Sequence, residues 1–463
     1  MKVKFEKNQL HAIKHGRGPL LIIAGAGTGK TTVITERIKY LALKKKVPVS
    51  SILALTFTEK ASLEMEERVD KVMPYGYTQM WISTFHSFCD RVLKQEAIHI
   101  GLSSSFKIMT EPESIIFLRK NLFKFNLRYF RPLGNPNKFL EGLVQHFSRL
   151  KDEDVSPIEY LQWAQNKKSR PKDDRPLAEN KEEIEKTLEL AKAYQLYEDL
   201  KVKEAVFDFS DLISNTLKLF RGRSNILAEY QNRFQYILVD EFQDTNYAQN
   251  ELAILLAGKK QNINVVGDDD QAIYRWRGAA ISNILQFKKH FPKTKIVVLT
   301  KNFRSTQEIL DKSYKLIQNN NPDRLEVREK ISKKLIAERE IKGDPIEFIF
   351  TDRVENEAEE VIEKIKELIK KKGYNYKRKF ASYAYKDFSI LVRANNHAEP
   401  FIRAFERHKI PYQFLGPGQL FRQDEIKDLI AYLKVLYNFE DSVSLYRVLS
   451  MNHFGIPPRD LAA

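Results

Sequence analysis

The sequence predicts an α/β fold with three parts: a parallel sheet that carries a phosphate-binding loop, a helical insertion, and a partial second α/β unit. Three observations support it. A short apolar run meets a glycine-rich turn at residues 18–34, further apolar runs alternate with helical patterns, and residues 106–200 show helical spacing without convincing strands. Strands that are buried on both faces and separated by helices are typical of a parallel sheet.

The first element is a strand, loop and helix over residues 18–34, with the sequence GPLLIIAGAGTGKTTVI. Glycines let backbone N–H groups turn toward a phosphate, and the dipole of the following helix attracts the anion. We expect Lys30 to reach the β and γ phosphates of a nucleotide and Thr31 to hold Mg²⁺. An ordinary glycine-rich turn is the alternative, because Ala24 replaces the glycine of the usual motif. The predicted nucleotide-binding loop comprises Ala24, Gly25, Ala26, Gly27, Thr28, Gly29, Lys30, Thr31 and Thr32.

The order of these patterns divides the chain into these three parts and a further helical segment at its C-terminal end. Residues 106–200 are interpreted as a helical insertion, and the apolar run at 295–299 is expected to open a second α/β unit. Strands are expected at residues 20–24, 52–58, 236–240, 264–267, 295–299, 347–350 and 388–392. The predicted domains are a first α/β domain over 1–105 and 201–294, the insertion over 106–200, a partial second domain over 295–440, and a further helical segment over 441–463.

The composition favours a polyanionic partner. The 463 residues include 77 Lys and Arg against 61 Asp and Glu, which gives a net charge of +16. Nucleic acid is the first candidate for such a partner, and a lysine-rich surface without a specific partner is the alternative. The single cysteine, Cys89, excludes an internal disulfide, and the sequence shows neither a signal peptide nor an apolar run of membrane-spanning length. We therefore expect a cytoplasmic protein without a membrane partner.

An acidic pair follows the apolar run at residues 236–240. Ligands of open α/β sheets bind at the carboxyl ends of the strands. Phosphate-loop enzymes need one carboxylate for the metal ion and one group that orients or deprotonates the attacking water. We expect Asp240 to take the first role and Glu241 the second. A solvated acidic turn at the end of a strand is the alternative.

A second polar turn combines charge with aromatic rings. Gln271 is expected to sense the γ-phosphate, and Tyr274, Trp276 and Arg277 follow it closely. Aromatic rings interleaved with arginine form stacking platforms for unpaired bases. A calcium loop is rejected because Ile273 stands where an EF-hand needs glycine. A buried core tryptophan is the remaining alternative.

Hydroxyl and aromatic side chains follow two further apolar runs. Phe57 and Thr58 come after the first run, and Phe85 and His86 after the second. We expect these four residues to contact the sugar-phosphate backbone and bases of a nucleic acid. A zinc site at His86 and Cys89 is not expected, because no second pair of ligands lies nearby in the sequence.

The segment LTKNFRST at residues 299–306 is expected to begin the second unit. Arg304, presented from that unit toward the phosphate site of the first, would act as an arginine finger. Phe303 would cover the face of an adenine. The alternative is an arginine that caps a helix or pairs with a surface carboxylate.

In this order and spacing, the motifs resemble those of the UvrD/Rep-type superfamily 1A DNA helicases, from about Phe5 to the end of the chain. The resemblance includes Gln9, in FEKNQL at residues 5–10, and segments at 206–212, 388–394 and 410–416. It implies two RecA-like domains that clamp ATP, and a motor that moves 3′ to 5′ on single-stranded DNA and separates duplex. By position, the implied roles are adenine binding by Gln9 and Phe303, Mg–ATP binding by Lys30, Thr31 and Asp240, general base catalysis by Glu241, γ-phosphate sensing by Gln271 and Arg304, and DNA binding by Phe57, Thr58, Phe85, His86, Tyr274, Trp276 and Arg277.

The resemblance also implies the biological setting. It predicts an ATP-dependent DNA helicase of DNA repair or replication, an ATP hydrolase that acts on single-stranded DNA and single-strand/duplex junctions. ATP and Mg²⁺ are the expected cofactors, a monomer or weak dimer is the expected state, and further protein partners would come from repair or replication. The insertion over 106–200 would be the first accessory subdomain, and 441–463 the truncated start of the second. Thr32 stands where family members often carry an arginine, which predicts weaker adenine binding.

The chain is expected to end before the later C-terminal motifs of this family, and so to be the N-terminal part of a helicase. One alternative is a truncated fragment or split subunit that binds ATP and single-stranded DNA with little motor activity alone. Another is a subunit of a helicase–nuclease, for which no nuclease domain is visible in these residues.

Overall fold

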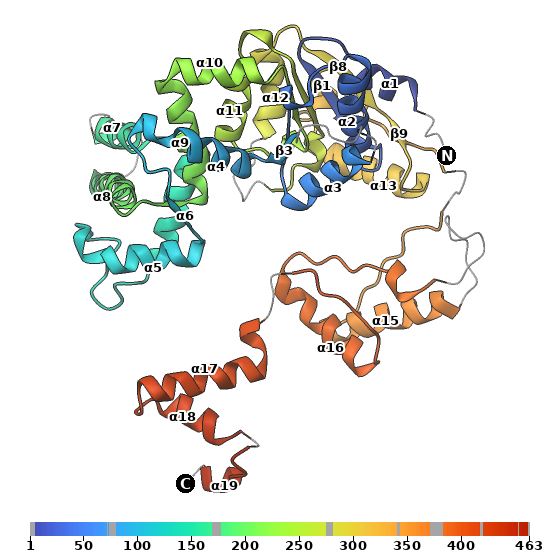
Figure 1. The fold of residues 1–463 in the computed structure, drawn as a ribbon. Coiled ribbons are helices and arrows are strands. Elements are labelled where there is room, and N and C mark those ends of the chain that lie inside the picture. Colours follow the sequence, from blue (N-terminus) through green and yellow to red (C-terminus); the bar gives the residue numbers. More distant parts are fainter. Residues whose placement is uncertain are drawn as a thin grey trace. The chain divides into compact units, whose positions relative to one another are not determined.

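The computed structural model describes residues 5–71, 73, 80–168, 177–274, 281–339, 343–370, 383–416, 420–451 and 453–461. The chain divides into two compact units, residues 1–346 and 347–463. The sheet and its surrounding helices belong to the first unit (Figure 1). None of the described helices combines the length and the apolar character that a membrane crossing requires.

A six-stranded sheet forms the centre of the first unit, and all of its neighbouring strands run parallel. This arrangement confirms the α/β fold class that the alternating apolar and helical patterns predict, consistent with a RecA-like domain. β3 is the strand expected before Phe85, for which no bounds were predicted, and the other five strands lie within one or two residues of their predicted bounds. In spatial order the strands are β3 (Trp81–Thr84), β2 (Ile52–Thr56), β6 (Tyr236–Val239), β7 (Ile263–Gly267), β1 (Leu20–Ala24) and β8 (Lys295–Leu299).

Helices cover both faces of this sheet, so that its strands are buried on two sides. Alternate residues of β1 enter different cores: Leu20 and Ile22 join one, and Leu21 and Ile23 join the other. One core is completed by α1 (Lys7–Ile13), α2 (Lys30–Lys39) and α3 (Glu59–Asp70). The other is completed by α4 (Phe85–Glu96), α9 (Phe209–Gly222), α10 (Ser224–Arg233), α11 (Tyr247–Ala257) and α12 (Ile281–His290).

The helical insertion has a hydrophobic core of its own. Phe117, Phe147, Tyr194 and Tyr197 lie in that core, which contains no residue of the six-stranded sheet. The insertion begins and ends in two short parallel strands that pair with each other, and their three-residue lengths explain why sequence patterns missed them. Its elements are β4 (Lys107–Met109), α5 (Glu111–Asn121), α6 (Leu140–Asp152), α7 (Pro157–Lys168), α8 (Leu177–Glu204) and β5 (Val206–Asp208).

A buried ionic cluster joins α6 and α8 of the insertion to the start of α9. Lys201 Nζ lies 2.9 Å from Asp208 Oδ2 and 2.6 Å from Asp211 Oδ2. Lys151 Nζ lies 2.6 Å and 2.7 Å from the same two carboxylates. Because the carboxylate of Asp208 also caps α9, the two buried ammonium groups tie the insertion to the first residues of that helix.

The boundary predicted near residue 295 differs from the structure. β8 pairs with β1 along its whole length, so it completes the edge of the first sheet instead of opening a second one. The pattern of a short apolar strand does not specify the sheet that it joins, which explains the difference. The rest of this segment also lies in the first compact unit: β9 (Lys301–Asn302), α13 (Gln307–Ile317), α14 (Leu325–Arg328) and β10 (Ile336–Ala337).

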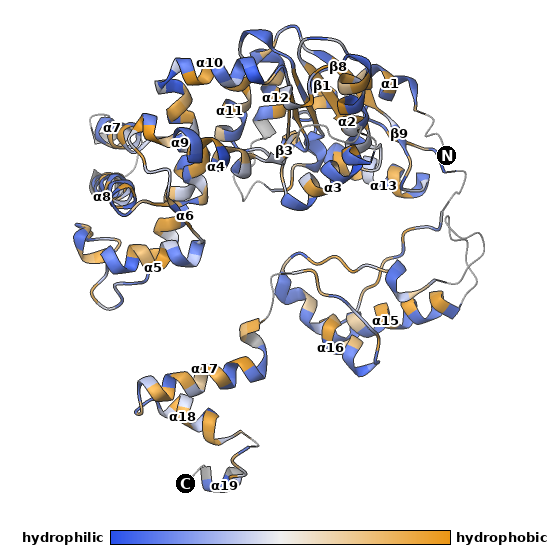
Figure 2. Ribbon diagram, viewed as in Figure 1, coloured by the Kyte–Doolittle hydropathy of each residue, from blue (hydrophilic) through white to orange (hydrophobic). Residues whose placement is uncertain are grey.

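The second unit is helical in its described residues. Ala358 and Ile362 of α15 (Val354–Lys370) pack against Ala404 of α16 (Glu399–Arg407), and Figure 2 shows hydrophobic and hydrophilic residues alternating along both helices. The strands expected at 347–350 and 388–392 are not assigned there, since neither segment has a ladder partner among the described residues. The remaining helices are α17 (Asp424–Tyr437), α18 (Ser442–Leu449) and α19 (Pro458–Leu461).

Candidate functional site

The glycine-rich loop runs from the end of β1 to the start of α2. Gly27 and Gly29 have φ angles of +76° and +86°, in the left-handed region that favours glycine. The Thr28 hydroxyl donates to the Gly25 carbonyl oxygen at 2.8 Å and closes the turn. The loop thus has the backbone geometry of a phosphate cradle, with the positive end of the α2 dipole behind it.

Asn302 contacts the outside of this loop, a role that the sequence patterns did not predict. Its side chain is buried, and its Nδ2 donates to the carbonyl oxygen of Ala26 at 2.6 Å. Its Oδ1 accepts from the backbone N–H groups of Arg304 at 2.8 Å and Ser305 at 2.7 Å. A Cβ at Gly27 would lie 2.7 Å from this amide, so the close approach also requires glycine. Asn302 therefore fixes the loop and the following arginine to each other.

Phe303 and Arg304 lie directly beside the loop. The Phe303 N–H donates to the carbonyl oxygen of Gly27 at 2.9 Å, and the ring is 44% exposed. A Cβ at Gly27 would lie 2.7 Å from the Cβ of Arg304. Both residues belong to the same compact unit as the loop, whereas the sequence predicted that the second unit presents them. The correction follows from β8, which brings this segment to the edge of the first sheet.

Gln9 supports the loop from α1. Its Nε2 donates to the carbonyl oxygen of Thr28 at 3.1 Å, and its Oε1 accepts from the N–H of Glu6 at 3.0 Å. Gln9 is buried, and both ends of its amide are bonded within the protein. Thr31 and Thr32 are half-buried in the first turn of α2. The role of Gln9 in adenine binding stays a prediction.

The carboxyl edge of the sheet brings the predicted catalytic residues together. Lys30 Nζ donates to Glu241 Oε2 at 2.6 Å and to Gln271 Oε1 at 3.0 Å. Glu241 has a φ of +47°, a strained backbone conformation for a residue with a side chain, and such strain often occurs at functional sites. Two turns that each lie more than 200 residues from Lys30 in the sequence therefore meet at its amino group.

Asp240 lies at the end of β6 and is 5% exposed. The backbone N–H of Glu241 donates to its Oδ1 at 3.0 Å. Burial and the adjacent Glu241 carboxylate raise the pKa of Asp240 to about 7, against the opposing effect of Lys30. A buried carboxyl group that ionises with difficulty gains from a nearby divalent cation, so Asp240 fits the predicted Mg²⁺ ligand.

Gln243 links the two acidic turns, and sequence reasoning did not identify it. Its Nε2 donates to Glu241 Oε2 at 2.8 Å, and its Oε1 accepts from the N–H of Asp268 at 3.1 Å. A Cβ at Gly267 would lie 2.6 Å from that oxygen, which explains the glycine at the end of β7. The strand–polar-turn pattern locates both turns but gives no signal for the side chain that joins them.

Those residues expected to bind DNA that the structure describes fall into three groups. The rings of Phe57 and Tyr274 lie 5.7 Å apart, and Thr58 caps α3 through the N–H of Ala61. Phe85 is 2% exposed in the hydrophobic core, which corrects the expectation that its ring contacts bases.

His86 forms the third group. Its ring packs edge-to-face on Phe209 at 6.1 Å, and burial lowers its pKa. Its imidazole is therefore held in a partly apolar environment at the start of α4. Trp276 and Arg277 lie outside the residues that the structure describes.

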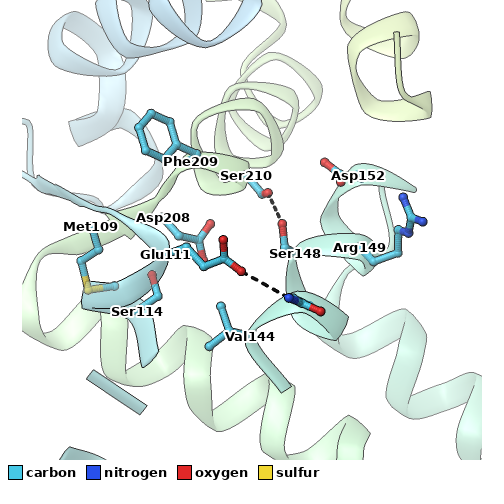
Figure 3. Close-up of a pocket in the computed structure, with 11 residues that line it drawn as sticks. Met109, Glu111, Ser114, Val144, Ser148, Arg149, Asp152, Asp208, Phe209 and Ser210 are labelled. Atoms are coloured by element: carbon cyan, nitrogen blue, oxygen red, sulfur yellow. Dashed lines mark hydrogen bonds between the residues drawn. The ribbon is translucent and has the colours of Figure 1, made fainter. Parts of the chain in front are cut away.

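A pocket of about 570 Å³ lies between the insertion and the start of α9 (Figure 3). The hydroxyl groups of Ser148 and Ser210 lie 2.7 Å apart in its wall. Glu111, Asp152 and Asp208 also line it, and burial raises the pKa of Asp152 to about 7. Three carboxyl groups make this pocket unfavourable for a phosphate, so the nucleotide site remains at the glycine-rich loop.

Family models match both parts of the chain. The UvrD/REP helicase N-terminal domain matches residues 5–292, and the UvrD-like helicase C-terminal domain matches residues 297–463. The model of the UvrD-like C-terminal domain therefore matches this chain as well, which corrects the expectation that the later C-terminal motifs are absent.

Individual curated proteins are similar along nearly the whole chain. A protein named ATP-dependent DNA helicase PcrA from Staphylococcus aureus (strain NCTC 8325 / PS 47) is 36% identical over 452 residues, which are 97% of this chain and 56% of that protein. The protein of the same name from Staphylococcus epidermidis (strain ATCC 12228 / FDA PCI 1200) is 36% identical over 450 residues, with the same coverage. The chain thus spans about half the length of these relatives.

Proposed function

The chain belongs to the UvrD/REP helicase family, and from this premise we propose that it is an ATP-dependent DNA helicase that hydrolyses ATP at the loop after β1. The observation that carries this proposal is the position of Lys30, whose ammonium group contacts both Glu241 and Gln271. Phosphoryl transfer requires a cation on the phosphates and a group that orients or deprotonates water. These groups converge at the carboxyl edge of the sheet, where α/β proteins bind their ligands.

The phosphates would be held by the loop N–H groups, the start of α2 and Lys30. In the structure Lys30 and Glu241 neutralise each other at 2.6 Å. A phosphate oxygen can replace the carboxylate as the partner of Lys30, which leaves Glu241 free to accept a proton from water. One pair of residues would thereby couple substrate binding to activation of the base.

Mg²⁺ is the metal ion that this proposal requires. The hydroxyl group of Thr31 and the carboxylate of Asp240 are the residues that would hold it, and the ion would neutralise charge that develops on the phosphate oxygens. The pKa of about 7 for Asp240 supports this assignment, because a cation would favour the ionised carboxylate.

Arg304, Phe303 and Gln9 complete the proposed ATP site. The backbone N–H of Arg304 is bonded to Asn302, whose amide also contacts the loop at Ala26. The guanidinium group of Arg304 would stabilise the negative charge of the γ-phosphate. Phe303 offers a partly exposed ring for adenine, and Gln9 would add hydrogen bonds to the base. Thr32 in place of an arginine predicts a weak preference for adenine.

Single-stranded DNA is the proposed track, with movement from 3′ to 5′ and a role in repair or replication. The net charge of +16 and the paired rings of Phe57 and Tyr274 support a nucleic-acid partner. His86, Trp276 and Arg277 are proposed to extend this contact. The alternative of a fragment with little motor activity is not favoured, because both family domains match the chain.

Unwinding of tailed duplexes tests the direction. A duplex with a 3′ single-stranded tail should be separated in the presence of ATP and Mg²⁺, while a duplex with a 5′ tail should stay intact. Equal unwinding of both substrates, or preference for the 5′ tail, would contradict the proposed direction. A chain that binds the tail but separates neither duplex would support the binding-fragment alternative instead.

A further inference from the structure

We infer that Lys333 is a positioning residue for the ATP site, although it lies about 300 residues from the glycine-rich loop in sequence. Its ammonium group holds Asp268, the carboxylate of Asp268 holds the amide of Gln271, and Gln271 holds the ammonium group of Lys30. The inference rests on the proposed function, because it assigns Lys333 to the same reaction.

The first link is a buried ammonium group between three carboxylates. Lys333 Nζ lies 2.5 Å from Asp268 Oδ1, 2.6 Å from Asp269 Oδ1 and 2.7 Å from Asp270 Oδ2. The three carboxylates offer oxygens within 4.8 Å of one another, an arrangement that could hold a metal ion. The Lys333 side chain is only 5% exposed and supplies the positive charge at that place. The acidic turn is therefore organised by a protein cation.

The second link passes from Asp268 to Gln271. Gln271 Nε2 donates to Asp268 Oδ2 at 2.7 Å, while the other oxygen of the same carboxylate faces Lys333. The amide nitrogen also lies 3.4 Å from the carbonyl oxygen of Ala24. Both acceptors lie on the nitrogen side of the amide, so its oxygen is directed to Lys30 at 3.0 Å. The orientation of Gln271 thus depends on a carboxylate that Lys333 fixes.

Further contacts outside this chain of links connect the acidic turn to α14. Arg324 makes two hydrogen bonds to Asp270, from Nε at 2.8 Å and from NH2 at 2.7 Å. The N–H of Leu325, the first residue of α14, donates to Asp269 Oδ2 at 2.7 Å. The segment around residues 324–333 consequently contacts all three aspartates. Its two cations, Arg324 and Lys333, partly neutralise the three carboxylates. Any shift of this segment would be transmitted to Gln271 through Asp268.

The test is a double-variant cycle on ATP turnover with saturating single-stranded DNA. Lys333→Met should lower kcat about 10²-fold with little change in KM, because a misplaced catalytic group affects the transition state more than binding. Gln271→Ala should lower kcat comparably, and the double variant should show no further loss. Lys333→Arg, which keeps the charge, should recover most of kcat. Multiplicative losses in the double variant, or unchanged kcat in Lys333→Met, would overturn the inference.

Stability and location need their own controls. Lys333→Met leaves buried carboxylates unpaired and could prevent folding. In that case the double variant Lys333→Met/Asp269→Asn is used instead, because it removes one carboxylate together with the ammonium group. Lys334→Met is the matched control, since that side chain is 58% exposed and its nearest carboxylate contact is 4.0 Å. An equal loss of kcat in Lys334→Met would contradict a specific role of Lys333.

The inference and the proposed function fail in different ways. If the wild-type chain shows no DNA-stimulated turnover, the proposed function fails, and no assignment of Lys333 to that reaction survives. If the wild type is active and Lys333→Met is equally active, only the inference fails. Ligand affinity gives a second readout. Lys333→Met should lower the affinity for Mg–ADP with aluminium fluoride, which mimics the transferring phosphate, and should leave the affinity for Mg–ADP alone unchanged. Equal weakening of both ligands would contradict the inference.

Discussion

Lys30 Nζ and Glu241 Oε2 lie 2.6 Å apart, at the carboxyl edge of the six-stranded sheet. The glycine-rich loop provides the lysine, and the turn after β6 provides the glutamate. The ammonium group donates a hydrogen bond to the carboxylate, so a phosphate oxygen that bound Lys30 would compete with Glu241 for it. In the proposed function, a lysine–phosphate contact would replace this ion pair when ATP binds and would release Glu241 to act as a base.

Glu241→Gln should separate binding from chemistry. Glutamine keeps a hydrogen-bond acceptor for Lys30 but is not a base, so turnover should fall about 10²- to 10⁴-fold while ATP affinity is retained or increases. DNA-stimulated phosphate release and titration of a fluorescent ATP analogue measure the two quantities. Glu251→Gln, on α11, is the matched control. Turnover close to the wild-type value would remove Glu241 from the role of base.

Asp240 should give the folded protein a distinct pH dependence. Burial and the neighbouring Glu241 carboxylate raise the pKa of Asp240 from the ordinary 3.8 to about 7 in the folded state. Between these values the folded state retains a proton that the unfolded state has lost, so the stability contributed by this group falls as pH rises toward 7 and then levels off. Asp240→Asn removes this titration, and the Tm of the variant relative to wild type should therefore increase from pH 4 to pH 7.

Mg²⁺ provides the control for that measurement. The ion favours ionised Asp240, so millimolar Mg²⁺ should raise the Tm of the wild type at pH 8 more than that of Asp240→Asn. Thermal melting at several pH values, with and without Mg²⁺, measures both effects. A Tm difference that is the same at pH 4 and pH 7 would show that the burial of Asp240 does not control its ionisation.

Asn302→Ala should loosen the loop. The change removes the partner of the Ala26 carbonyl oxygen and of the Arg304 N–H, and each unsatisfied buried group costs about 1–3 kcal/mol. We expect a lower Tm and about tenfold or greater loss of ATP affinity. Asn320→Ala, at an exposed position of the same unit, is the control for general effects. Unchanged nucleotide affinity would show that the loop keeps its shape without this contact.

Tyr274→Ala should weaken binding of single-stranded DNA by about 1–3 kcal/mol, the usual contribution of one base stacked on an aromatic ring. Phe57→Ala should act similarly, and the two losses should be less than additive because the rings lie 5.7 Å apart. Fluorescence anisotropy with labelled oligonucleotides at fixed salt measures the affinity. Tyr247→Ala on α11 is the control, and an equal loss there would indicate that stacking at Tyr274 is not specific.

Lys201→Met should destabilise the protein by about 3–5 kcal/mol, since removal of one partner leaves buried carboxylates unpaired. Urea unfolding measures the difference, with the exposed Lys203→Met as the matched control. Equal stability of the two variants would show that the buried cluster does not anchor the insertion.

The sequence predicted the site where local patterns were sufficient. Lys30, Asp240 and Gln271 each follow a short apolar strand, and parallel strands end at one edge of the sheet, so their convergence could be expected. Asn302, Gln243 and Lys333 carry no such signal. Asn302 contacts a loop 276 residues away, and Lys333 contacts aspartates more than 60 residues away. Such pairings depend on tertiary packing, and a single sequence does not encode them as a period or a motif.

In the fold, too, local patterns predicted the elements but not their tertiary partners. The parallel sheet and the helical insertion follow from hydrophobic periodicity, which specifies the type of each element. Periodicity does not specify the partner of a strand. β8 was therefore assigned to the wrong unit, and β4 and β5 were too short to identify.

The most direct test compares ATP hydrolysis by the wild type and Lys30→Ala, with and without single-stranded DNA and in the presence of Mg²⁺. Lys39→Ala, at the end of the same helix and paired with Glu36, is the matched control. The account predicts that single-stranded DNA strongly stimulates hydrolysis by the wild type and by Lys39→Ala, and that Lys30→Ala loses this activity while it still binds DNA. DNA-stimulated hydrolysis that persists in Lys30→Ala would contradict the account.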